Sequence, residues 1–109
     1  MTARAPEDPL AFIQRCVRER RVYWTYHLNM RIAGRNISRD EILTAVDTHA
    51  VIESYPEDKY RPSYLVMAVG GTSAFHVLFA SDVEGNNVRI ATAYRPNLDE
   101  WEEDLKPER

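Results

Sequence analysis

The chain has 109 residues, of which 44% are hydrophobic and 28% charged, so its length and composition are those of one globular domain. Its formal net charge of −3 argues against a general nucleic-acid binder, and its single cysteine excludes an internal disulfide framework. No signal peptide is visible, and Gly70-Gly71 interrupts the uncharged stretch 62–81, so we expect a cytoplasmic protein without a membrane span.

The charge is unevenly distributed along the chain. Residues 1–35 contain seven arginines and only three acidic residues, whereas residues 97–109 are strongly acidic. An acidic end is typical of a solvated helix terminus, but it could also shield a basic face or repel RNA. We treat 1–109 as a single domain and expect flexible ends at 1–8 and 106–109.

Three helices are predicted in the first half of the chain. Asp8 and Pro9 form an N-cap followed by proline at the first helical position, and apolar residues then recur at helical spacing. After a short extended joint at 22–24, Thr25 can cap a second helix over residues 26–34. Ser38 and Glu41 have the spacing of a capping box, which predicts a third helix.

After residue 49 the hydrophobic period changes to two, which is typical of strands. Four strands are predicted, over residues 51–55, 64–69, 75–80 and 88–94. Tight turns between the last three predict antiparallel neighbours. The last strand alternates so that one face carries Val88, Ile90, Thr92 and Tyr94. Pro96 ends this strand, and 98–105 is predicted as a short acidic helix.

These elements predict an α+β fold. Three N-terminal helices pack on one face of a four-stranded antiparallel sheet, and a short C-terminal helix follows.

The second predicted helix carries the residues best suited to chemistry. His27, Arg31 and Arg35 are four residues apart, and each step turns only about 40° around a helix, so the three form one stripe. Guanidinium groups suit phosphate, and a histidine can transfer a proton near neutral pH. The same stripe is also typical of an exposed helix whose arginines are solvated or paired with acids.

Other candidate sites are weaker. The three histidines are well separated and Cys16 falls on an apolar helix face, so we predict no metal and no cofactor. Tyr94 and Arg95 end the last strand, where side chains project from the rim of a sheet. His76 lies inside a strand, which is more typical of a core or cross-strand residue than of a catalytic one.

Four segments in this order resemble an uncharacterised bacterial family of domains of unknown function, whose signature is His-x3-Arg-x3-Arg-Gly/Asn-Ile-Ser. The segments are His27-x3-Arg31-x3-Arg35-Asn36-Ile37-Ser38, Ile52-Glu53-Ser54-Tyr55-Pro56, Phe75-His76-Val77 and Thr92-Ala93-Tyr94-Arg95-Pro96. The layout is also similar to the RelE/BrnT-like toxin superfamily. This resemblance implies a RelE-like fold, cleavage of RNA and neutralisation by a cognate antitoxin.

Two functional hypotheses follow. In the first, the chain is a toxin-type endoribonuclease in which His27 and Tyr94 are catalytic, and Arg31, Arg35 and Arg95 bind the RNA phosphate. In the second, the chain is a non-catalytic module of the same fold that binds a partner protein or a second copy of itself through its sheet or a sheet edge.

Overall fold

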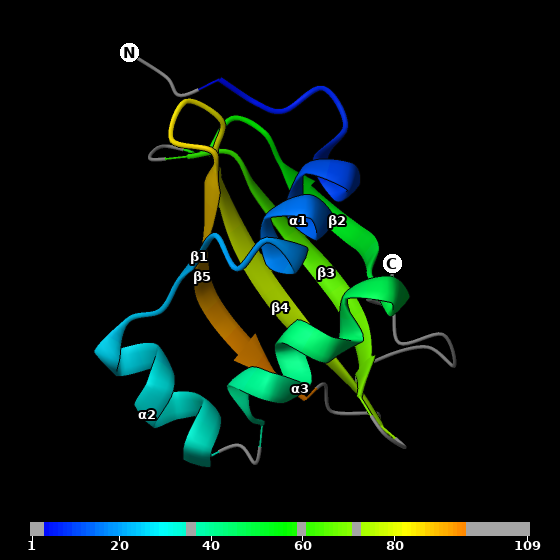
Figure 1. The fold of residues 1–109 in the computed structure, drawn as a ribbon, viewed down its shortest axis with the longest axis vertical. Coiled ribbons are helices and arrows are strands. Elements are labelled where there is room, and N and C mark those ends of the chain that lie inside the picture. The colour runs from blue at the N-terminus through cyan, green and yellow to red at the C-terminus, as the bar shows by residue number, and fades with distance from the viewer. Residues whose placement is uncertain (1–3, 35–36, 59–60, 71–72, 96–109) are drawn as a thin grey trace.

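The computed structural model describes residues 4–34, 37–58, 61–70 and 73–95 (Figure 1). It is an α+β fold with its helices in the first half of the chain. In chain order the elements are α1 (Pro9–Arg18), β1 (Val22–Tyr23), α2 (Tyr26–Gly34), α3 (Arg39–Thr44), the 3-10 helix η1 (Ala45–Thr48), β2 (Ala50–Tyr55), β3 (Ser63–Gly70), β4 (Ser73–Asp82) and β5 (Asn87–Tyr94). None of the helices in these ranges has both the length and the apolar character needed to cross a bilayer.

The strands form one mixed sheet in the order β1-β5-β4-β3-β2. The pairs β5–β4, β4–β3 and β3–β2 are antiparallel. Strand β1 instead runs parallel to β5, with Val22 opposite Val88. The prediction of a four-stranded antiparallel sheet is therefore wrong in both strand number and direction. The segment 22–24, predicted as a joint, supplies the fifth strand, and the Val88 amide donates to the Arg21 carbonyl at 3.0 Å to hold it there.

The predicted helix starts are confirmed by their capping contacts. The Asp8 carboxylate accepts from the Ala11 amide at 3.1 Å, and the Thr25 hydroxyl accepts from the Leu28 amide at 3.0 Å. Ser38 and Glu41 form the reciprocal capping box. The predicted helix 98–105 lies outside the described residues.

The helices cover one face of the sheet. Helices α1, α3 and η1 lie over this face, here called the helix face (Figure 1), and two buried residues of α2, Leu28 and Ile32, belong to the same hydrophobic core. Among the described elements, no helix lies over the opposite face, here called the open face. The core under the helices includes Ile13, Val17, Ile42, Val66, Phe75, Val77, Phe79 and Ile90.

A bulge in β5 changes which side chains share a face. Phe79 of β4 lies opposite Ile90, but the preceding residue Leu78 lies opposite Thr92, so Ala91 is an extra residue on β5. Val88 and Ile90 are therefore buried on the helix face, whereas Thr92 and Tyr94 turn to the open face. The prediction that all four share one face is wrong, because strict alternation ends at the bulge.

Candidate functional site

The structure leaves the predicted helical stripe untested. His27 and Arg31 fall within α2, but their side chains lie outside the described part of the structure, and Arg35 lies outside the described residues altogether. Their roles as base and phosphate ligands remain predictions.

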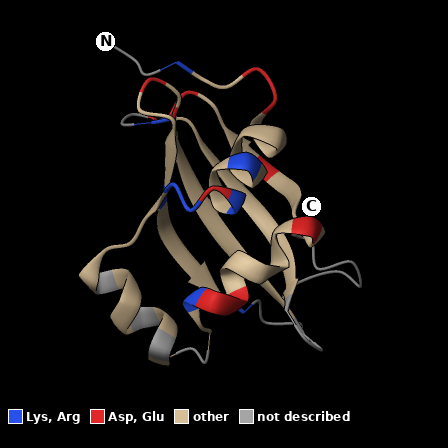
Figure 2. Ribbon diagram, viewed as in Figure 1, with Lys and Arg blue, Asp and Glu red and all other residues tan. Residues whose placement is uncertain are grey.

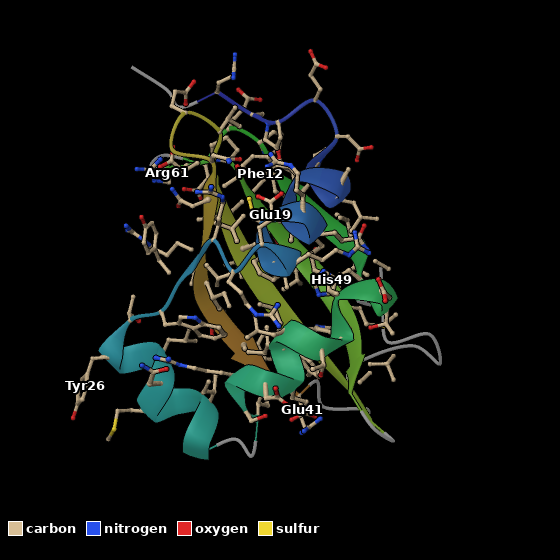
Figure 3. All side chains as sticks on the ribbon, viewed as in Figure 1. Phe12, Glu19, Tyr26, Glu41, His49 and Arg61 are labelled. Atoms are coloured by element: carbon tan, nitrogen blue, oxygen red, sulfur yellow. The ribbon has the colours of Figure 1, made fainter. Side chains whose placement is uncertain are left out.

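Tyr94 and Arg95, predicted to act together, are directed to opposite faces of the sheet. The Arg95 guanidinium pairs with the Glu41 carboxylate of α3 at 3.0 Å and lies 5.9 Å from the centre of the Phe75 ring, on the helix face. Glu41, labelled in Figure 3, therefore offsets the charge predicted to bind phosphate. Tyr94 instead lines a hollow on the open face.

His76 is a fully buried cross-strand partner of Tyr94, in agreement with its predicted place inside a strand. Its Nδ1 lies 3.4 Å from the Tyr94 hydroxyl, and the two rings meet edge to face with their centres 5.4 Å apart. The contact fixes the position of the Tyr94 hydroxyl at the rim of the open face.

The open face carries a hollow of about 370 Å³. Its described lining combines two carboxylates, two tyrosines, two small hydroxyl residues and two leucines: Glu53, Asp58, Tyr55, Tyr94, Ser63, Thr92, Leu65 and Leu78. The Tyr55 hydroxyl donates to Glu53 Oε1 at 2.8 Å, which orients that carboxylate. We call this lining set the open-face hollow. Its described lining contains acids and no arginine.

Positive charge is dispersed over the described surface. Arg18 at the end of α1 is followed directly by Glu19, and Arg39 at the start of α3 is followed by Asp40 and Glu41, so basic and acidic residues adjoin at both places (Figure 2). Six described arginines form ion pairs with carboxylates: Arg4 with Glu84, Arg15 and Arg21 with Glu19, Arg18 with Asp47, Arg61 with Asp82, and Arg95 with Glu41. The described residues therefore present no large basic patch of the kind that a polyanion needs.

A second hollow, of about 460 Å³, lies between the start of α1 and β2. His49, labelled in Figure 3, lines it and is 6% exposed. The centre of its ring lies 5.7 Å from that of Phe79, with the two ring planes tilted by 49°. Neither ring nitrogen has a hydrogen-bond partner within the described ranges. Burial, together with the positive charge of the nearby Arg18, lowers the pKa of His49 to about 4, so the ring is neutral at pH 7.

Two other kinds of chemistry find no support in the described ranges. Cys16 is fully buried in α1, and desolvation raises its pKa, which disfavours the thiolate needed for nucleophilic attack. No group of three or more potential metal ligands gathers among the residues that the structure describes.

Apart from Tyr94, the residues that form these hollows were not singled out from the sequence as a site. Glu53 and Tyr55 are two apart in a predicted strand, so strand alternation alone places them on one face and could have paired them. Asp58 and His49 are brought to their hollows by tertiary contacts, which the sequence pattern does not predict.

Comparison with known proteins identifies a family. No curated protein and no solved structure matches the chain. Residues 24–95, well over half of the chain, match the family described as Domain of unknown function (DUF4258). The match runs from before α2 to the end of β5 and contains every described residue of the open-face hollow. The chain therefore belongs to the DUF4258 family of domains of unknown function, as its ordered motifs predicted in outline.

Proposed function

We propose that the chain is a non-catalytic binding module that receives a basic segment of a partner polypeptide in the open-face hollow. The observation that carries the proposal is the lining itself, in which Glu53 and Asp58 lie among tyrosine and leucine side chains.

Electrostatics decides between a cationic and an anionic ligand. Two unit charges about 5 Å apart near a protein surface interact with an energy on the order of 3 kcal/mol. A lysine or arginine in the hollow gains this attraction from each carboxylate, and a tyrosine face adds about 0.5–1 kcal/mol. An RNA phosphate in the same place meets repulsion of similar size. The hollow therefore favours a basic peptide over nucleic acid.

Neutralising one carboxylate tests this proposal. A short probe peptide in which arginine alternates with valine is titrated into the protein by calorimetry, with a glutamate–valine peptide as control. Glu53→Gln is expected to weaken binding of the arginine peptide about tenfold, because a partly desolvated charge pair is worth roughly 1–3 kcal/mol. The matched control Glu57→Gln changes an exposed acid outside the described lining and is expected to leave the affinity unchanged. Equal binding of both peptides, or an unaltered affinity in Glu53→Gln, contradicts the proposal.

The second candidate is the toxin-type ribonuclease implied by the resemblance to the RelE/BrnT-like toxins. The contact between Tyr94 and His76 favours it, because a tyrosine held by a histidine at the edge of a hollow can take part in proton transfer. A base would remove the proton of the RNA 2′-hydroxyl, its oxygen would attack phosphorus, and an acid would protonate the leaving 5′-oxygen. His27, Arg31 and Arg35 keep their predicted roles in this proposal, and the neutralising partner would be an antitoxin.

Incubation of the purified protein with total RNA tests this second candidate. Under the ribonuclease hypothesis, Tyr94→Phe slows cleavage about 100-fold, which is the usual contribution of a proton-transferring group. Tyr26→Phe is the matched control, since Tyr26 is 74% exposed on α2 and does not belong to the described lining. RNA left intact by the wild-type protein, or cleaved equally by the wild-type and Tyr94→Phe proteins, rules the candidate out.

A further inference from the structure

Strand β2 lies at one end of the sheet and has a hollow on each side of it. Only β3 pairs with it within the described ranges, and no described strand lies along its outer edge. Glu53 and Tyr55 of β2 line the open-face hollow, and Val51 and Ser54 of the same strand line the second hollow.

The register of β2 explains this division. Val51 lies opposite Val66 and Ser54 opposite Tyr64, both of which are buried in the helix-face core. Between them the register shifts at Ile52, so Glu53 and Tyr55 turn to the open face. The same six-residue strand therefore contributes side chains to hollows on both faces of the sheet.

The hollow on the helix face suits an apolar side chain. Pro9 and Leu10 at the start of α1 and Val51 of β2 form its apolar walls, and the neutral imidazole of His49 lies beside them. The Asp8 carboxylate at its rim already caps α1 through the Ala11 amide.

We propose that the partner polypeptide docks as an additional strand along the outer edge of β2, with alternate side chains in the two hollows. Backbone groups of an end strand can pair with an added strand, and pockets on either side then select its alternating side chains. The segment that fits carries basic residues toward the open face and apolar residues toward the helix face. This inference rests on the proposed function, to which it adds the docking mode and the pattern of the partner sequence.

A second copy of the chain fits this edge less well than a basic segment does. In an antiparallel β2–β2 pair centred near Glu53, the two Glu53 side chains would lie together on the open face. Like charges directly opposite each other destabilise a strand pair. An arginine-bearing segment instead brings the opposite charge to the same position.

Backbone methylation of the probe tests the docking mode and leaves the protein unchanged. The arginine–valine peptide is made in two isomers, one N-methylated at every arginine and the other at every valine. In an extended strand these two sets of N–H groups point to opposite edges, so one isomer is expected to lose at least about tenfold in affinity and the other to bind like the parent.

Each outcome has a definite meaning. Equal affinities of the two isomers overturn strand docking but leave the proposed function standing, provided that the unmethylated peptide still distinguishes Glu53→Gln from wild type. Absence of binding by the unmethylated peptide overturns both. A dimer of the free chain that the peptide dissociates, detected by light scattering, assigns the edge to a second copy and overturns the inference.

Discussion

Acidification is expected to lower the free energy of unfolding by about 3 kcal/mol through His49 alone. The pKa of His49 is about 4 in the folded chain and 6.5 in the reference state that represents the unfolded one. Each unit of difference is worth about 1.4 kcal/mol. Between these two values the unfolded chain binds a proton that the folded chain does not, so stability is full above pH 6.5 and is lost as the pH falls toward 4.

Two substitutions distinguish the effect of His49 titration on stability from the cost of burying ring nitrogens that have no hydrogen-bond partner among the described residues. His49→Gln cannot titrate but keeps a buried polar group, whereas His49→Leu removes both. Both variants are expected to lose this slope of stability between pH 6.5 and 4. At pH 7, His49→Leu is expected to be about 1 kcal/mol more stable than His49→Gln, because buried unpaired polar atoms are costly.

Urea unfolding followed at several pH values gives the measurement. His27 and His76 are present in all three proteins, so differences between the curves report His49. Asp82 does not interfere, because a hydrogen bond from the Gly85 amide lowers its pKa below the usual 3.8. Its contribution to the free energy of unfolding is therefore lost only below pH 3.8. Parallel pH curves for wild type and His49→Leu would refute the assignment.

Much of the local structure was predictable because its causes are local. The caps at Asp8, Thr25 and Ser38 are contacts between residues three apart, and each is present in the structure. The long strands extend over enough positions for the period of two to be recognised in the sequence, most clearly in the last of them. Their predicted bounds differ from those of β2 to β5 by only a few residues at each end.

The features that the sequence did not reveal are tertiary. A two-residue strand such as β1 has no period, and its partner Val88 lies far along the chain. The extra residue Ala91 is set by the pairing of β5 with β4, and it turns Thr92 and Tyr94 to the open face, away from Val88 and Ile90. Tyr94 and Arg95 were predicted to act together at the end of the strand, but neighbouring residues of a strand point to opposite faces, and these two side chains do so in the structure.

Phe79→Ala is expected to cost about 3–5 kcal/mol, the usual loss for truncating a fully buried aromatic side chain. Phe79 is 0% exposed and lies on the helix face, opposite Tyr64 on β3 and Ile90 on β5, with the tilted ring of His49 beside its own. Domains of this size have a total stability of roughly 5–15 kcal/mol, so the variant should be close to unfolding at room temperature. Urea unfolding of the variant and wild type measures the loss.

The preceding residue provides the matched control, because it faces the other way. Leu78 lies opposite Thr92 and lines the open-face hollow, where it is only partly buried. Leu78→Ala leaves a space that water can enter, so we expect it to cost clearly less than Phe79→Ala. The difference between these adjacent substitutions measures the asymmetry between the helix face and the open face. Equal losses would mean that the open face is covered as thoroughly as the helix face, and the hollow could not then receive a partner.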